Sequence, residues 1–198
     1  QDSDGQFIGL TVAEDIAFAL ENDCVPTAEM HETVRKIAKL VNVEQVLSHA
    51  PQEISGGQKQ RVALGGVMVG DVDVLLFDEP LANLDPATGK QAISLIDEIQ
   101  KHTGCAVIII EHRVEDVLYR PVDRIVLMED GRIRFDGNPD ELLSTDLLPQ
   151  GGIREPLYVT ALKYAGVAIT ADMRPSYLPE LALTDAQKAQ VRRWFASQ

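Results

Sequence analysis

The sequence has little cysteine, few basic residues and no long apolar run. Its two cysteines, Cys24 and Cys105, lie far apart and outside any CxxC pattern, so neither a disulfide framework nor a metal cluster is indicated, and we expect a reducing, cytoplasmic setting. No apolar run approaches the roughly 20 residues that a membrane-spanning helix needs, and the first residues lack the basic-then-apolar pattern of a secretion signal. We therefore expect a soluble chain.

The shortage of lysine and arginine argues against one class of partner. These residues number 18 against 31 aspartates and glutamates, which gives a net charge of -13. Such a surface would repel a nucleic-acid backbone, whose binding requires basic side chains that displace counterions, so we expect no nucleic-acid partner. The rest of the composition, 45% hydrophobic and 25% charged, is that of an ordinary globular protein.

Apolar runs alternate with helical patterns along the first two thirds of the chain. The runs at 72–77 and 105–110 predict strands buried on both faces. Helices that connect buried strands indicate a parallel sheet, because parallel neighbours need a crossover connection. The sequence therefore predicts an α/β fold with its functional residues at the carboxyl ends of the strands. The helical patterns lie at 11–20, from 27 to 41, from 55 to 69 and after Pro86, and the first of them is opened by a capping box of Thr11 and Glu14.

The last third of the sequence has a different character. Asp130-Gly131 predicts a hairpin at the sheet edge, because this pair accommodates positive backbone dihedral angles. A short helix is expected from Asn138. From residue 148 onward, prolines and glycines interrupt any long periodicity, and we interpret 148–198 as a linker or appendage that ends in a helix opened by the capping box of Thr184 and Gln187.

The segment Ser55-Gly56-Gly57-Gln58 precedes a predicted helix. Free backbone N–H groups and the positive end of the helix dipole would face an anion placed there, and the two glycines would permit its close approach. A glycine turn that only caps the helix is the alternative interpretation of these four residues.

Three other residues stand where strands are predicted to end, and a fourth precedes Pro86. Asp78 and Glu79 follow a predicted buried strand, where carboxylates are costly unless they meet a cation or donors; a capped strand end with solvated acids is the alternative. His112 follows the second strand and would lie beside them if the strands are neighbours, or it could be structural. Asp85 could simply cap the next helix.

These motifs occur in the order and approximate spacing of ABC ATPases, and the chain resembles that family over residues 1–145. The resemblance implies a partial P-loop NTPase domain over 1–147, with the helical signature subdomain and the C-terminal part of the sheet core, and an extension over 148–198. It implies ATP and Mg²⁺ as cofactors. It also implies that Asp78 holds Mg²⁺ through water, that Glu79 orients or deprotonates the attacking water and that His112 contacts the γ-phosphate.

The resemblance also implies roles at a dimer interface. Ser55, Gly56, Gly57 and Gln58 would cover the γ-phosphate of an ATP held by a second ATPase half, and Asp85 would lie in the D-loop that couples the two nucleotide sites. The first residues resemble the Q-loop, so that Gln1 would approach the metal and the attacking water; a polar N-terminal tail is the alternative.

Two segments resemble a subgroup, the ATPase subunits of energy-coupling-factor importers. These are Gln1–Asp4 with 12–18, although Ser3 stands where the subgroup has proline, and 152–166, which is similar to the segment after the first half of fused two-ATPase members. The resemblance implies a peripheral location on the cytoplasmic face of the membrane, a transmembrane coupling subunit and a substrate-binding membrane subunit as partners, and uptake of a vitamin or metal ion. The alternatives are a soluble ABC ATPase that acts on ribosomes or DNA, and a non-catalytic interaction fragment.

One expected motif is missing. No GxxxxGKS or GxxxxGKT occurs in the sequence, so no loop of backbone amides with a lysine is present to hold the β- and γ-phosphates. With no start methionine, the chain is expected to be a fragment that begins at the Q-loop and lacks Walker A. We expect it to have negligible ATPase activity alone.

Overall fold

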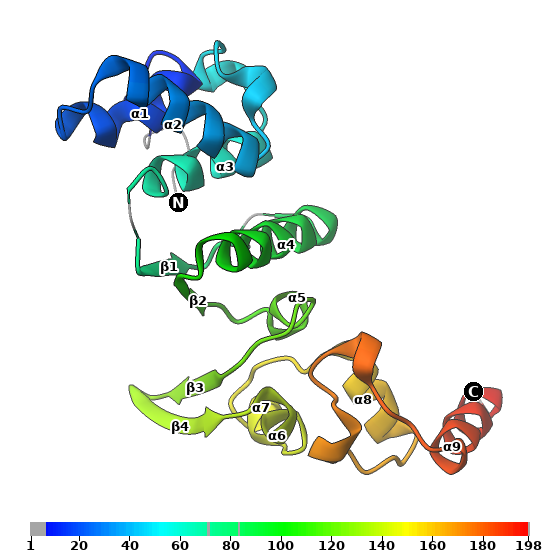
Figure 1. Ribbon diagram of the computed structural model, residues 1–198. Coiled ribbons are helices and arrows are strands. Elements are labelled where there is room, and N and C mark those ends of the chain that lie inside the picture. The colour runs from blue at the N-terminus through cyan, green and yellow to red at the C-terminus, as the bar shows by residue number, and fades with distance from the viewer. Residues whose placement is uncertain (1–6, 71, 83, 198) are drawn as a thin grey trace. The chain divides into compact units, whose positions relative to one another are not determined.

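The computed structural model describes residues 7–70, 72–82 and 84–197 (Figure 1). The chain divides into two units, Gln1–Leu75 with Ile99–Val107, and Leu76–Glu98 with Ile108–Gln198. Each unit is described by itself. No helix among the described residues is both long and apolar enough to cross a membrane.

Three packed helices dominate the first unit: α1 (Val12–Asn22), α2 (Thr27–Leu40) and α3 (Gly56–Val67). Short 3-10 turns at Glu44–Val46 and Pro51–Glu53 connect α2 to α3. The predicted capping box is confirmed at α1, where the Thr11 hydroxyl accepts from the Glu14 N–H and the Glu14 carboxylate accepts from the Thr11 N–H.

The helices pack closely because α3 carries a glycine at the contact. A Cβ atom at Gly65 would lie 3.2 Å from Ile37 of α2 and 3.5 Å from Ile16 of α1, which is tighter than usual for the first contact. Ile16 is fully buried. Gly65 therefore lets the backbone of α3 approach the side chains of both other helices. The core of this unit also contains Val12, Leu20, Val34, Ala38, Val41 and Val62.

Strands β1 (Val74–Asp78) and β2 (Ala106–Ile110) are neighbours in one sheet, joined in sequence by α4 (Pro86–Thr103). The Ala106 N–H donates to the Asp73 carbonyl (2.8 Å) at the start of the pair, and the Glu79 N–H donates to the Ile110 carbonyl (2.9 Å) at its end. The start of β1 lies beside the start of β2, and the end of β1 beside the end of β2. The strands therefore run parallel, as the α/β prediction requires.

The prediction that these strands are buried on both faces is wrong for the described residues. Leu75 is 4% exposed, but its neighbour Leu76 is 64% exposed, and Ile108 and Ile110 of β2 are each 52% exposed. The run of apolar residues indicates a strand with two apolar faces. Burial of both faces needs packing partners, and the described part of the chain does not cover the outward side chains.

The second unit continues with α5 (Val114–Val117) and an antiparallel hairpin of β3 (Ile125–Glu129) and β4 (Arg132–Gly137). The predicted Asp-Gly turn is confirmed, since Asp130 and Gly131 have φ of 49° and 74°. Within the described residues the hairpin forms a two-stranded sheet of its own.

The C-terminal part is folded over most of its length. Helices α6 (Pro139–Leu143), α7 (Leu147–Gln150), α8 (Leu157–Tyr164) and α9 (Asp185–Ala196) alternate with 3-10 turns at Ala171–Met173 and Leu178–Glu180. The sequence indicated the first and last of these helices and read the middle as irregular. Instead, α8 contributes to a continuous core, whose buried members include Leu127, Leu142, Leu148, Val159, Leu162, Val167 and Ile169.

Candidate active site

Asp78 ends β1, and Glu79 makes the first turn after it. Glu79 has a φ of 48°, in the left-handed region that a residue with a Cβ atom adopts at a cost of roughly 1–2 kcal/mol. Its N–H group is bonded to the last carbonyl of β2, so this conformation is held by the neighbouring strand. Strained backbone held in this way is common at functional sites.

His112 follows β2 and lies beside Glu79. The Nδ1 atom of His112 is 3.9 Å from Oε1 of Glu79 and 3.6 Å from Oε2 of Glu111. These separations are too long for hydrogen bonds, but they place the ring edge next to two carboxylates. The predicted proximity of Glu79 and His112 is therefore confirmed as geometry.

The carboxylates of Asp78 and Glu79, which the sequence predicts to be buried at a cost, are exposed in the described chain. Asp78 is exposed, and the side chains of Glu79 and His112 are 53% and 70% exposed. Their solvation needs no cation. The groups instead form an open set of side chains at the ends of two parallel strands, accessible to a ligand.

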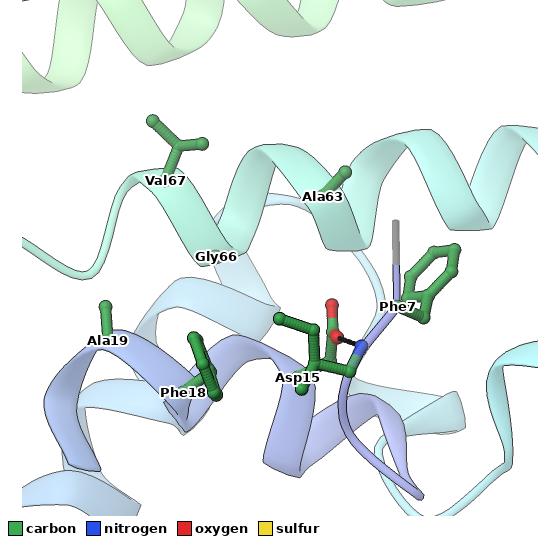
Figure 2. A pocket seen from close by; sticks show the side chains of 8 residues that line it. Phe7, Asp15, Phe18, Ala19, Ala63, Gly66 and Val67 are labelled. Carbon is green, nitrogen blue, oxygen red and sulfur yellow. Dashed lines mark hydrogen bonds between the residues drawn. The ribbon is translucent and has the colours of Figure 1, made fainter. Parts of the chain in front are cut away.

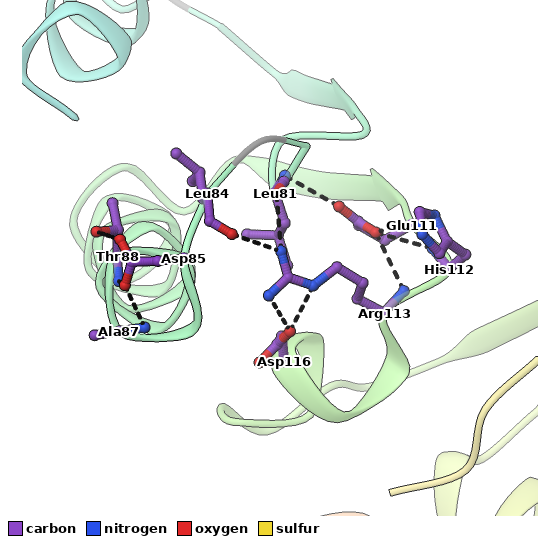
Figure 3. Close-up of polar contacts among 9 residues, drawn as sticks. All are labelled: Leu81, Leu84, Asp85, Ala87, Thr88, Glu111, His112, Arg113 and Asp116. Atoms are coloured by element: carbon purple, nitrogen blue, oxygen red, sulfur yellow. Dashed lines mark hydrogen bonds and ion pairs between the residues drawn. The ribbon is translucent and has the colours of Figure 1, made fainter. Parts of the chain in front are cut away.

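Two residues that the sequence analysis did not select complete this region (Figure 3). The Glu111 side chain is 2% exposed, and its carboxylate accepts from the N–H groups of Leu81 (3.0 Å), His112 (2.9 Å) and Arg113 (3.2 Å). The guanidinium of Arg113 donates to the carbonyls of Leu81 (2.9 Å) and Leu84 (3.1 Å). Their only signal in the sequence was their position directly beside His112.

Asp85 caps α4, as the simpler reading of its position predicted. Its carboxylate accepts from the N–H groups of Ala87 (2.9 Å) and Thr88 (3.1 Å) and from the Thr88 hydroxyl (Figure 3). The Thr88 hydroxyl, followed by the Thr88 N–H, holds the pKa of Asp85 below its ordinary value. Asn83, the second residue of the proposed D-loop, lies outside the described residues.

The Ser55 segment belongs to the first unit and opens α3. The Ser55 hydroxyl accepts from the Gln58 N–H (3.3 Å), and the Gln58 side-chain oxygen accepts from the Ser55 N–H (2.8 Å). The structure therefore contains the helix cap that the alternative interpretation of this segment expects. A Cβ atom at Gly56 would meet nothing within 4 Å, so the space beside this first turn is open. Gln1 lies outside the described residues.

An open apolar pocket of about 260 Å³ lies beside α1 and α3 (Figure 2). Asp15 shapes one side of it, because its Oδ1 atom accepts from the N–H groups of Ile8 (2.9 Å) and Gly9 (3.3 Å) and holds the segment before α1. A Cβ atom at Gly9 would lie 2.4 Å from the Asp15 backbone nitrogen, so this close approach requires glycine. The lining residues include Phe7, Ile8, Phe18, Ala63 and Val67.

Comparisons with known proteins identify the family of this chain. The profile of the ABC transporter family matches residues 1–82, and a profile described as ATP-binding cassette cobalt transporter matches residues 145–198. The chain belongs to the ABC transporter ATP-binding proteins. Its α/β fold is accordingly that of the ABC ATPase, present as a partial domain.

Several curated relatives cover nearly the whole chain. A protein of Photobacterium profundum, named for the ABC transporter ATP-binding proteins, is 58% identical over 98% of this chain and 34% of its own length. A relative in Enterococcus faecalis is 59% identical over 92% of the chain and 32% of its own length. The chain therefore spans about a third of the length of these relatives.

A solved structure gives the same fold. CbiO1 from Clostridium perfringens, described as part of the ABC transporter complex CbiONQ, is 31% identical and superposes with a TM-score of 0.70 over 82% of this chain and 64% of CbiO1.

Proposed function

We propose that this chain is part of the nucleotide-binding subunit of an energy-coupling-factor importer, in which ATP binding and hydrolysis drive uptake of a small molecule. The observation that carries the proposal is the pairing of Glu79 with His112 at the adjacent ends of β1 and β2, where Nδ1 and Oε1 are 3.9 Å apart. This arrangement offers a carboxylate and an imidazole to one reacting water and one phosphate.

In this proposal Glu79 orients or deprotonates the attacking water, and His112 contacts the γ-phosphate and helps to hold that water. Asp78 holds Mg²⁺ through a water molecule. The described residues contain no cluster of three or more side chains that could bind a metal by themselves. The two adjacent carboxylates fit Mg²⁺, which uses one or two carboxylates together with waters and nucleotide phosphates and neutralises developing charge when bound.

A second ATPase half completes the site. We propose that Ser55, Gly56, Gly57 and Gln58 cover the γ-phosphate of an ATP whose other phosphates are held by the partner half. The open space beside Gly56 and its position in the first turn of α3 support this role. Asp85 would couple the two sites through the D-loop, and Gln1 would approach the metal. The half supplying the phosphate loop could be separate or fused.

The pocket lined by Phe7, Phe18 and Val67 is the proposed docking site for the transmembrane coupling subunit. Its apolar lining supports this role, as does Phe7, which directly follows the proposed Q-loop segment in the sequence. The CbiONQ complex that contains CbiO1 supports membrane partners generally. The subunit would then lie on the cytoplasmic face of the membrane, with a separate membrane protein binding the substrate. A metal ion is the favoured cargo over a vitamin, because the profile matching 145–198 is described for cobalt transporters.

Two assays test the catalytic part. The full-length protein, meaning the protein to which this chain belongs, is expected to hydrolyse Mg-ATP and to lose turnover in Glu79→Gln. Residues 1–198 alone, which lack a GxxxxGKS or GxxxxGKT loop, are expected to show no turnover at millimolar Mg-ATP. Turnover by residues 1–198 that disappears in Glu79→Gln would contradict the expected inactivity, and full-length turnover that survives Glu79→Gln would contradict the proposed mechanism.

Purification from membranes tests the transport part. The full-length protein is expected to co-purify with integral membrane subunits and a retained metal ion. Co-purification with ribosomes in their place would favour the soluble ABC ATPase, and partner binding without any ATP turnover would favour the interaction module. The boundary between a domain over 1–147 and an extension over 148–198 stays a prediction, and it falls within α7, whose Leu148 is buried in the same core as Leu127 and Leu142.

A further inference from the structure

The loop between β1 and α4 is held by side chains from the segment that follows β2. Leu81 is the anchor of this loop, with a side chain that is fully buried. Its N–H group donates to Glu111, and its carbonyl accepts from Arg113. Both main-chain polar groups of one residue are therefore bound by two side chains that flank His112. The same loop begins with Glu79 and ends with Asp85.

Glu111 is matched to its surroundings as a carboxylate. A carboxylate only accepts hydrogen bonds, and Glu111 meets three backbone N–H donors, at 3.0 Å from Leu81 on one oxygen and at 2.9 and 3.2 Å from His112 and Arg113 on the other. A glutamine has the same shape, but its NH₂ group would replace one of these oxygens. At least one partly buried donor, the N–H of Leu81 or of Arg113, would then lose its acceptor.

Arg113 makes a second tie to the same loop. Its Nη1 atom donates to the carbonyls of Leu81 and Leu84, while Nε and Nη2 each lie 2.7 Å from Oδ2 of Asp116 on α5. The salt bridge orients the planar guanidinium, so that its remaining nitrogen reaches the loop. A lysine keeps the charge but has one ammonium group, which cannot serve Asp116 and both carbonyls with this geometry.

We propose that Glu111 and Arg113 are positioning residues for ATP hydrolysis, which hold Leu81 and Leu84, and with them Glu79 and Asp85, at a fixed distance from His112. This inference rests on the proposed function. It follows from the two hydrogen bonds that Glu111 and Arg113 make to the backbone of Leu81, because a shift of Leu81 would also move the backbone of Glu79 and Asp85. Misplacement of a catalytic group by about 1 Å can cost roughly 100-fold in rate.

The test uses Glu111→Gln, Arg113→Lys and the double variant in the full-length protein. Each single variant is expected to lower kcat by roughly 10-fold or more, with KM for Mg-ATP unchanged, because neither side chain is expected to bind nucleotide. The two changes disturb one loop, so the double variant should lose much less than the product of the single losses.

A matched structural control separates positioning from folding. Asp140 also accepts a backbone N–H, that of Ser176 at 2.7 Å, within the same unit but away from the candidate site. Asp140→Asn is expected to lower the melting temperature and to leave kcat unchanged when all variants are assayed well below their melting temperatures.

The possible outcomes are distinct. Unchanged kcat in both single variants, or equal falls of kcat in these and in Asp140→Asn, would overturn the positioning role. If the loss of kcat in the double variant equals the product of the two single losses, Glu111 and Arg113 do not act through their common contact with Leu81. If the unsubstituted protein shows no turnover, or turnover that survives Glu79→Gln, the proposed function fails first, and the inference fails with it.

Discussion

The imidazole of His112 faces the carboxylate of Glu79 across the ends of two parallel strands, with 3.9 Å between Nδ1 and Oε1. We predict that His112→Ala in the full-length protein lowers kcat by roughly 100-fold or more, because a group that positions a water and a phosphate acts in the transition state. Steady-state ATPase assays at saturating Mg-ATP measure this. His31→Ala, on an exposed position of α2, is the control and should behave as wild type; equal losses in the two variants would contradict the role of His112.

Local sequence patterns predicted the parts of the fold that depend on near neighbours. The capping boxes at Thr11 and Thr184 and the Asp130-Gly131 turn all formed where the pattern indicated. Each relies on groups within four residues, so the sequence contains both partners side by side.

Features that depend on distant partners were missed. Glu111 and Arg113 bond to Leu81, which lies on another loop about 30 residues away, and neither belongs to a motif that names the contact. The exposure of Leu76 and Ile108 also depends on what packs on the sheet rather than on the strand itself. Helix α8 was missed because it has only eight residues between Pro156 and Gly166, too few for its apolar residues to show a helical period.

The ion pair between Lys163 and Glu155 is predicted to stabilise the C-terminal part. The Glu155 side chain is 7% exposed, and its carboxylate lies 2.6 Å from the Lys163 ammonium, which also lies 2.8 Å from Asp146. Burial acts to lower the pKa of Lys163, but hydrogen bonds to Asp146 and Glu155 outweigh it and raise this pKa above its ordinary value.

Lys163→Met should lower the free energy of unfolding by about 2 kcal/mol, because it leaves Glu155 buried without its charged partner. Urea denaturation measures the loss. Lys163→Met combined with Glu155→Gln should recover part of it, since the unpaired charge is then removed as well. A double variant less stable than Lys163→Met would contradict the pairing.

Tyr158 predicts a dependence of stability on alkaline pH. Its hydroxyl donates to the Pro175 carbonyl (2.6 Å), and burial, aided by the charges of Glu115 and Asp140, raises the pKa of Tyr158 to about 12 from 10.0. The folded state therefore favours the neutral phenol. This contribution is complete below pH 10 and is lost as the pH rises from 10 towards about 12.

Removing the hydroxyl removes this dependence. Tyr158→Phe should be less stable than the wild type below pH 10, and the difference should shrink as the pH rises through the interval up to about 12. Chemical denaturation of both proteins at several pH values measures it. A difference that stays constant over this interval would show that Tyr158 titrates alike in the folded and unfolded chains.

The pocket beside α1 predicts where a membrane partner binds. Phe18 is 39% exposed and lines the pocket with Phe7 and Val67, so an apolar side chain of the partner would remove these surfaces from water. We expect Phe18→Glu to abolish co-purification of the full-length protein with its transmembrane subunit. A buried unpaired carboxylate at this contact would cost more than the lost apolar area alone.

Leu10→Glu provides the matched control for this variant. Leu10 is 82% exposed and precedes the same helix, but it does not line the pocket. The control should retain the membrane subunit, while both variants should keep the basal ATPase activity of the full-length protein. If Phe18→Glu keeps its partner, or if Leu10→Glu loses it equally, the docking surface lies elsewhere, because surface charge near α1 would then explain the result without the pocket.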